Sequence, residues 1–201
     1  MAYDINSIES LSFREGVRKR IQMYLGSDDI EGTYQALKEI INNSTDEALA
    51  GYGKKIKIEV DESSNSIIVR DFGRGVPFGI REDGENVLVS IYTKSHTGGK
   101  FSNDSYKNAS GLNGIGGSCV CLSSKQFQVK SFRDGIMASA SFVKVNYLFT
   151  QKYQLLNQMV PKFFLFQIQK YSVMVKLVSL MRESVKILRQ SPIFTVELLS
   201  L

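Results

Sequence analysis

The clearest pattern of apolar and polar positions lies between residues 36 and 51. Small or apolar residues recur there at steps of three and four positions, namely Leu37, Ile40, Ile41, Ser44 and Ala48. This is the period of a helix that packs one face against a core and turns a polar face away from it. Gly51 follows, and glycine in the left-handed conformation is common just after a helix. The pattern therefore predicts an amphipathic helix that ends at Gly51.

Two pairs of segments in which apolar and polar residues alternate predict two β-hairpins. Residues 55–61 alternate as a half-buried strand, residues 63–65 form a turn, and residues 66–71 return as the second strand. Residues 127–134 and 136–143 predict a second hairpin around a glycine. Together with the helix, these hairpins predict an α+β fold, a two-layer α/β sandwich.

The remaining segments of this part of the chain are less regular. Residues 1–12 are expected to form an N-terminal arm, and a charged helical turn begins at Arg14. That turn mixes both signs of charge, which favours a solvated face over a nucleic-acid contact. Residues 80–92 resemble a further helix, and residues 118–124 a buried helix of one or two turns. Between them, residues 93–107 form a long polar loop, and such loops commonly act as lids or binding loops.

Composition narrows the class of protein. The 201 residues are 43% apolar and 22% charged, which indicates a soluble globular chain with a proper core. The first residues hold no apolar signal segment, and no run approaches the roughly 18 apolar residues of a membrane span. We therefore expect a cytoplasmic protein without a membrane segment. Cys119 and Cys121, with His96 as the single histidine, are too few ligands for zinc, and we interpret both as buried small residues.

Charge and glycine content change near Val145. All 16 glycines precede this residue, and none occurs in the last 57 residues. Residues 1–144 hold 18 basic and 18 acidic side chains, whereas residues 145–201 hold seven basic and two acidic ones. The whole net charge of +5 therefore comes from residues 145–201, which we treat as an atypical tail.

Candidate chemistry lies on the polar face of the central helix. Asn43 follows Glu39 by four residues, and Asp46 or Glu47 follows by seven or eight. At these steps a carboxylate, an amide and a second carboxylate stack along one side of a helix. Oxygen ligands of this kind suit Mg²⁺, which keeps its other positions for water and phosphates. An ordinary solvated surface helix is the alternative interpretation.

A second candidate follows the strand at residues 66–71. Asp71 stands at the end of this strand, just before Gly73 and Gly75. A carboxylate there can accept a hydrogen bond from an exocyclic amine, and the glycines let a flat ring approach the backbone. Adenine carries such an amine, whereas guanine has a carbonyl at that position. Alternatively, Asp71 only caps its own turn.

A glycine-rich segment, residues 111–117, precedes the short helix predicted at 118–124. Such a segment offers backbone N–H groups and the positive end of a helix dipole to an anion, as phosphate sites do. Its G-x-x-G-x-G spacing matches neither the dinucleotide fingerprint nor the P-loop, so the signal is weak by itself. His96 has no nucleophile framework around it, and we interpret it as a loop residue.

Taken in order, four blocks resemble the N-terminal ATPase domain of the B subunit of type IIA DNA topoisomerases. This is the gyrase and topoisomerase IV family, which has the Bergerat ATP-binding fold. The blocks are Val-Arg-Lys-Arg with Met-Tyr-Leu-Gly (17–26), Glu-x3-Asn-x2-Asp-Glu-Ala-Leu-Ala-Gly (39–51), Asp-x-Gly-Arg-Gly-x-Pro (71–77), and His-Thr-Gly-Gly-Lys-Phe through Gly-Leu-Asn-Gly-Ile-Gly (96–116). The resemblance covers about residues 8–144. The chaperone, mismatch-repair and histidine-kinase relatives lack Asp-Glu-Ala-Leu-Ala-Gly and Gly-Gly-Lys-Phe.

The resemblance implies an ATP-binding domain at residues 13–144 that uses Mg²⁺. It makes Glu39 the general base that polarises the attacking water, and it makes Asn43 the residue that holds Mg²⁺ across the phosphates. Asp71 would recognise the adenine amine, and Gly75 would help through a bound water. A carboxylate that orients water, beside a metal and N–H groups that neutralise phosphates, is what phosphoryl transfer to water requires.

The same resemblance implies the rest of the pocket. Asp46 or Glu47 would position it, with Glu47 pairing with Arg74. Lys100 and the glycine segment would contact the phosphates, Tyr106 the nucleoside, and Arg133 the rim. The further binding residues expected are Pro77, Lys100, Tyr106, Gly111, Leu112, Asn113, Gly114, Ile115, Gly116 and Arg133.

The sequence departs from the family pattern in three places. Ile21 and Gln22 stand where the family usually has Pro-Gly after Val-Arg-Lys-Arg. Asn42 stands where it has Asp, and Asn113 where it has His. None of these removes an expected role, and together they indicate a divergent branch.

The tail departs further. The family should next show a strand with Asn-Gly-Thr, whose threonine shares the adenine water, then Pro-Asp, a helix and another strand. If each codon is started one base earlier, the codons of residues 156–162 are compatible with the string Glu-Pro-Asn-Gly-Thr-Lys. Those of residues 167–172 are then compatible with Pro-Asp-Pro-Glu-Ile-Phe. Both strings are what the family has in this region. Our hypothesis is that residues 145–201 are an out-of-frame reading of that region, which would leave the domain incomplete at its C-terminus and short of a strand. A genuine helical module that binds nucleic acid or a partner is the alternative.

The family implies ATP hydrolysis that drives dimer closure for DNA strand passage. The implied partners are DNA, the topoisomerase A subunit and a second copy of the domain bound in an ATP-dependent way. Two other functions stay open. One is a truncated nucleotide-binding protein or regulator without turnover, and the other is a different ATPase of the same fold.

Overall fold

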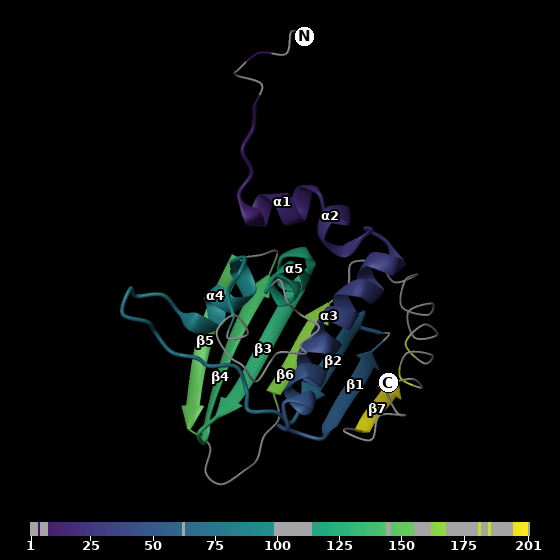
Figure 1. Ribbon diagram of the computed structural model, residues 1–201, viewed down its shortest axis with the longest axis vertical. Helices are drawn as coiled ribbons and strands as arrows, with labels where there is room; N and C mark the ends of the chain where they lie inside the picture. The colour runs from purple at the N-terminus through teal and green to yellow at the C-terminus, as the bar shows by residue number, and fades with distance from the viewer. Residues whose placement is uncertain are drawn as a thin grey trace.

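Seven strands form one sheet in the order β5-β4-β3-β6-β2-β1-β7 (Figure 1). The computed structural model describes residues 4, 8–61, 63–98, 114–143, 146–154, 162–167, 181, 185 and 195–200. The strands are β1 (Lys55–Asp61), β2 (Ser66–Asp71), β3 (Gln126–Arg133), β4 (Ile136–Val143), β5 (Asn146–Gln154), β6 (Lys162–Gln167) and β7 (Thr195–Ser200). All neighbours are antiparallel except β7, which runs parallel to β1.

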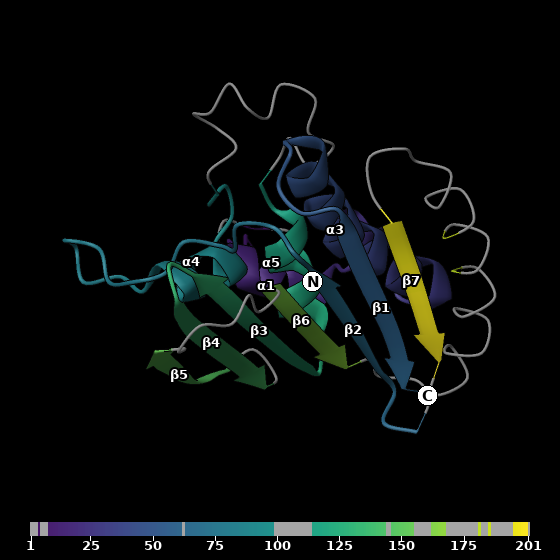
Figure 2. The same ribbon diagram turned by 90° about the horizontal axis from the view of Figure 1, so that it is seen from below.

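The described helices lie on one face of this sheet, which gives the predicted two-layer α+β architecture (Figures 1 and 2). They are α1 (Phe13–Lys19), α2 (Gln22–Leu25), α3 (Ile30–Leu49), α4 (Val87–Thr93) and α5 (Gly116–Ser123). Of these helices, α3 crosses β1 and β2, while α4 and α5 cover the β3 and β4 side (Figure 1). Among the described residues, no helix is long and apolar enough to cross a bilayer.

Local sequence signals explain where the helices begin and end. Ser12 and Glu15 form a reciprocal capping box at the start of α1. The Asp29 side chain accepts the Glu31 N–H at the start of α3, which lies earlier in the chain than the apolar pattern predicts. At the other end, Gly51 has φ +89° just after the cap residue, as predicted for a glycine that ends the helix.

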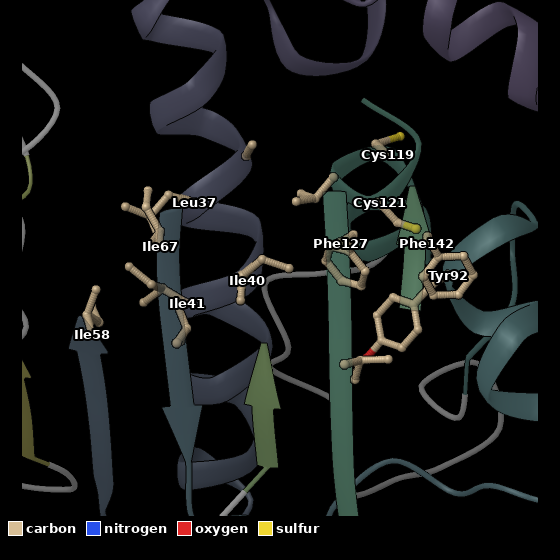
Figure 3. Packing of buried hydrophobic residues seen from close by; sticks show 14 of the residues in the cluster. Leu37, Ile40, Ile41, Ile58, Ile67, Tyr92, Cys119, Cys121, Phe127 and Phe142 are labelled. Atoms are coloured by element: carbon tan, nitrogen blue, oxygen red, sulfur yellow. The ribbon is translucent and has the colours of Figure 1, made fainter. Parts of the chain in front are cut away.

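The core lies between α3 and the sheet. The predicted apolar face of α3 is buried: Leu37 and Ile41 lie beside Ile67 of the sheet, while Ile40 points toward the side of Phe127 (Figure 3). A second group packs beside it under α4 and α5, where the rings of Tyr92 and Phe127 lie 5.2 Å apart and those of Phe127 and Phe142 lie 6.1 Å apart. Cys119 and Cys121 are buried free thiols in this group, as predicted.

Both predicted hairpins are confirmed. In the first, Ile56 of β1 pairs with Asp71 of β2, and in the second, Phe127 of β3 pairs with Phe142 of β4. The helix predicted at residues 80–92 is wrong in its first half. Ile80 and Asn86 form an isolated bridge, and the Asn86 side chain caps a helix that starts only at Val87.

The tail differs most from expectation. It supplies β5, β6 and β7, and β6 lies inside the sheet between β3 and β2. The described part of the tail is therefore not a purely helical module. Met181 and Val185, between β6 and β7, are helical and buried in the core.

Candidate functional site

The central helix α3 carries four of the predicted site residues on one side. Glu39, Asn43 and Glu47 are half-buried, and they recur at the four-residue step that keeps them on one side of the helix. Asp46, three residues after Asn43, lies on the same side and is 3% exposed. None of these four side chains is fully exposed.

At the C-terminal half of α3, Asp71 is held by two donors. It is the last residue of β2 and only 2% exposed. The Ser44 hydroxyl donates to its Oδ2 at 3.1 Å, and the Gly73 N–H donates to its Oδ1 at 3.0 Å. The Gly73 bond is the local turn cap of the alternative interpretation, while the Ser44 bond joins the carboxylate to α3. Asp71 therefore has a fixed orientation between helix and strand.

The predicted pair between Glu47 and Arg74 is present. The guanidinium donates through Nη2 to Oε1 at 3.1 Å and through Nε to Oε2 at 3.2 Å, a two-point contact. The Arg74 backbone N–H also donates to Oε2 at 3.3 Å. On its other side, the guanidinium lies 3.7 Å from the centre of the Tyr52 ring. These contacts fix the loop after β2 to the last turn of α3.

The same loop is fitted closely against β3. Gly75 has φ +78°, and a Cβ on it would lie 2.4 Å from the Phe132 carbonyl oxygen. The Ser131 hydroxyl donates to the Val76 carbonyl at 2.7 Å. Pro77 follows and is exposed. Close backbone packing, rather than a ligand, is thus what the structure itself requires of Gly75.

Arg133 ends β3 next to this loop. Its side chain is 43% exposed and lies 3.5 Å from the Asp134 carboxylate. This position is at the border of the site, where the resemblance places a rim residue.

In the middle of α3, Glu39 and Asn43 face the first turn of α5. A Cβ on Gly116 would lie 2.0 Å from Glu39 Oε2, so the carboxylate touches the start of that helix. A Cβ on Gly117 would lie 4.0 Å from Asn43 Nδ2. The Gln35 amide donates to Glu39 Oε1 at 3.1 Å, one turn earlier on α3. The fold therefore brings the predicted base, the predicted metal ligand and the glycine segment together.

This arrangement suits a polyanion. Helix α5 begins at Gly116, and the N-terminus of a helix carries backbone N–H groups and a partial positive charge. Gly114 has φ +61°, the left-handed region that favours glycine, just before Ile115 at the start of α5. The glycines at 114 and 116 thus let the backbone come close to Glu39 without side chains in between.

Burial raises the pKa of three groups in or beside the site. Burial, followed by the negative charge of Glu39, raises the pKa of the Cys119 thiol to about 12. Burial, followed by the charge of Asp71 and then of Cys121, raises the pKa of the Tyr92 hydroxyl well above its usual value. Burial also raises the pKa of Cys121. Both thiols are therefore protonated at neutral pH and poor nucleophiles.

The side chains of the site limit which metal ions it could hold. In the described part of the chain, no group of three or more His, Cys, Asp and Glu residues is arranged to hold a metal ion. Mg²⁺ needs less, because it is commonly bound by one or two protein oxygens together with substrate phosphates and water. The Asn43 amide beside Glu39 and the bare backbone at Gly116 fit that requirement.

Several predicted residues lie outside the described part. These are Lys100, Tyr106, Gly111, Leu112 and Asn113. His96 is described and stands in an exposed turn with φ +52°, a loop position as predicted.

Sequence reasoning missed four residues of the site. The helical period places Ser44 on the apolar face, although a serine in a buried stripe itself signals a polar partner. Gln35 supports Glu39 from one turn away, a spacing that the sequence does show. Tyr52 and Tyr92 join the site only through the fold, so no local pattern identifies them.

Three comparisons extend these observations. The family model described as histidine kinase-, DNA gyrase B-, and HSP90-like ATPase matches residues 28–138. The B subunit of DNA topoisomerase 4 from Enterococcus faecalis is 43% identical over 134 residues, which cover 67% of this chain and 19% of that protein. The B subunit of DNA gyrase from Thermus thermophilus is 43% identical over 136 residues, which cover 67% and 21%. The B subunit of DNA topoisomerase 4 from Staphylococcus aureus is 41% identical over 140 residues, which cover 70% and 21%.

The chain thus spans about one fifth of the length of these relatives. Among solved structures, the 43K ATPase domain of Thermus thermophilus gyrase B, in complex with an aminocoumarin, matches with a TM-score of 0.69 and 28% identity. That match covers 86% of this chain and 44% of the other. Residues 1–144 are less than three quarters of the sequence, so the structural match includes part of the tail.

These matches agree with the resemblance found in the sequence motifs. The family model covers more than half of the chain and includes the described site from Glu39 through Gly116 to Arg133. The relatives at 41% and 43% identity are the B subunits of gyrase and of topoisomerase IV, the two proteins that the motifs resemble. The chain therefore belongs to the family of histidine kinase-, DNA gyrase B- and HSP90-like ATPases.

Proposed function

We propose that this chain binds ATP with Mg²⁺ between α3 and α5 and hydrolyses it. The observation that carries the proposal is the contact between the Glu39 carboxylate and the first turn of α5, where a Cβ on Gly116 would lie 2.0 Å from Oε2. A carboxylate so close to a helix N-terminus can orient a water toward a phosphate held by that helix.

The adenine end of the site would be formed by the loop after β2. Asp71 would accept a hydrogen bond from the exocyclic amine, since its oxygens keep lone pairs beyond those used by Ser44 and Gly73. Glu47 and Arg74 would hold the loop in place, and Gly75 and Pro77 would line the approach of the ring. Asp46, buried on the same side of α3 as Asn43, would support this end from within the helix.

The phosphate end would use Glu39, Asn43 and α5. The Asn43 amide oxygen would hold Mg²⁺, which neutralises charge on the phosphates when bound. Glu39, supported by Gln35, would take the proton of the attacking water. The backbone at Gly114, Ile115 and Gly116 would hold the phosphate oxygens.

The resemblance assigns the remaining contacts. Lys100 and residues 111–113 would complete the phosphate contacts, Tyr106 would contact the nucleoside, and Arg133 would stand at the rim. For the longer protein to which such a domain belongs, we propose the type IIA role, in which ATP drives dimerisation of the domain and passage of DNA with the A subunit. That role is cytoplasmic and needs no membrane.

We also propose that residues 145–201 are an out-of-frame reading of the family's own C-terminal half of this domain. Two features support this. The relatives match only 67% to 70% of the chain, and the composition changes near Val145.

Two experiments test these proposals. The 201-residue chain should hydrolyse ATP with Mg²⁺, and Glu39→Ala should lower kcat by about 10²- to 10⁴-fold, the usual contribution of a general base, while ADP still binds. Turnover that survives the substitution would reject Glu39 as the base. Sequencing the gene through codon 145 decides the second proposal, since the absence of a topoisomerase-like frame there would end it.

A nucleotide-binding protein without turnover is the second candidate function. The break in family likeness at the tail favours it, because that region would carry the adenine-side threonine, and the family's transducer lysine, which contacts the terminal phosphate, would follow further downstream. ADP binding with no hydrolysis by the wild-type chain would select this candidate. A different ATPase of the same fold would be selected if DNA and an A subunit never stimulate hydrolysis by an in-frame chain.

A further inference from the structure

Ser44 occupies an unusual place in the core. It is 1% exposed and lies on the face of α3 that otherwise buries Leu37, Ile40 and Ile41. A polar side chain at such a position needs a partner, since an unpaired buried hydroxyl is costly. The partner is Asp71, whose Oδ2 lies 3.1 Å from the Ser44 hydroxyl.

The hydroxyl has a choice between two acceptors. The Ile40 carbonyl, one turn earlier on the same helix, lies 3.3 Å away, and serines inside helices often bond back to it. A hydroxyl carries one proton, however, and a hydrogen bond to a charged acceptor is stronger than one to a neutral carbonyl. The shorter distance agrees with this preference. Ser44 therefore donates mainly to the Asp71 carboxylate.

This bond has a consequence for what Asp71 can bind. With Gly73 donating to Oδ1 and Ser44 to Oδ2, both oxygens of the carboxylate are held in a fixed direction. A carboxylate held in this way presents acceptor oxygens to a ligand. It can pair with the amine at position 6 of adenine, but it opposes the carbonyl oxygen that guanine has there.

We propose that Ser44 is a positioning residue that sets the preference of the site for adenine over guanine by fixing the direction of the Asp71 acceptor oxygens. This inference rests on the proposed nucleotide site. Without the Ser44 hydroxyl, the carboxylate has one partner fewer to hold its direction, so its oxygens face the adenine amine less well. Guanine has no amine at that position and loses nothing, so discrimination falls.

The test compares ADP and GDP binding by titration calorimetry on the whole 201-residue chain. Ser44→Ala should lower the ratio of ADP to GDP affinity by about tenfold, the effect of one hydrogen bond to a charged group. Ser44→Thr keeps a hydroxyl and should restore the ratio. Thr45→Val is the matched control, because Thr45 is the next residue on α3 and its hydroxyl donates only to the Asn42 carbonyl among the described contacts.

The outcomes separate this inference from the proposed function. If the wild-type chain binds neither nucleotide, the proposed site fails and the inference with it. If the wild-type chain binds ADP but Ser44→Ala weakens ADP and GDP equally, or changes neither, the inference alone is overturned. Should Ser44→Ala not fold, Ser44→Cys replaces the hydroxyl by a weaker donor of similar shape, and an unchanged ratio there would overturn the inference as well.

Discussion

The two halves of the site lie along the middle and the last turns of α3 and are built differently. At the adenine end, Asp71 and Glu47 have their partners within the protein, and the Gly75 backbone packs against the β3 backbone. At the phosphate end, the backbone at Gly116 packs against the carboxylate of Glu39, which lies at the end of a side chain that can rotate. The first half is thus rigid before any ligand arrives, whereas the second half can still adjust.

This difference suits the chemistry proposed for each end. Recognition of a base gains from acceptors that are already oriented, because no ordering is needed when the ring binds. A general base must approach a water that arrives with the substrate, and hydrogen bonds of this kind often become tight only in the complex. Substitutions at the two ends should therefore fail in different ways.

The largest effect is expected at the rigid end. Asp71→Asn replaces an acceptor by an amide that also donates, so we expect ADP affinity to fall by roughly a hundredfold, the cost of mismatching a buried charged group. Titration calorimetry measures this. Asp61→Asn makes the same chemical change at the far end of the β1–β2 hairpin and should leave ADP affinity unchanged. Equal losses in both variants would contradict the role of Asp71.

A smaller loss, of a different kind, is expected at the adjustable end. In Gly116→Ala the new Cβ pushes the Glu39 carboxylate away, so kcat should fall by about tenfold to a hundredfold, as displacements of about 1 Å do. Folding should be unharmed, since alanine suits a helix better than glycine. The loss should vanish in a Glu39→Ala background, and a full additional loss there would contradict the contact between Gly116 and Glu39.

Gly75→Ala should act on stability instead. Its Cβ would meet the Phe132 carbonyl at 2.4 Å, and a backbone atom cannot rotate away. We expect the free energy of unfolding to fall by about 2 kcal/mol or more, measured by urea denaturation. Gly84→Ala is the matched control, because Gly84 has a similar φ of +81° but nothing within 4 Å. If both variants lose the same amount, the close packing of Gly75 contributes nothing.

The smallest effect concerns a turn outside both ends. Hydrogen bonds, first from the Ser63 and Ser64 hydroxyls, lower the pKa of Asp61 from 3.8 to about 2. A carboxyl whose pKa is lowered by folding stabilises the protein above the unfolded pKa, and this share is lost as pH falls toward the folded pKa. Acid unfolding followed between pH 4 and 2 should therefore be less steep in Asp61→Asn. An identical acid profile would show that these bonds contribute no stability.

The sequence alone predicts much of this architecture. The period of α3, its glycine stop and both hairpins are local patterns, and all are found where expected. The predicted start of α4 is wrong because the apolar residue Ile80 pairs with Asn86 in a bridge instead of entering the helix. The pairing of Glu47 with Arg74 is expected only from the resemblance, since 27 residues separate them.

The tail could not be predicted because its strands depend on distant partners. Residues 162–167 are a short apolar run, which periodicity cannot distinguish from part of a buried helix. Their place between β2 and β3 is fixed by pairing with Asp71 and Lys130, which lie far earlier in the chain. The contact of Ser44 with Asp71 escapes prediction for the same reason, because it forms only when α3 packs on β2.

The most direct test of the whole account is a crystal structure of this chain with Mg²⁺ and a non-hydrolysable ATP analogue. We expect the adenine amine to donate to Asp71, with the phosphates between Asn43 and the first turn of α5. A nucleotide bound elsewhere, or none bound at a saturating concentration of the analogue, would contradict the site that α3 and α5 are proposed to form.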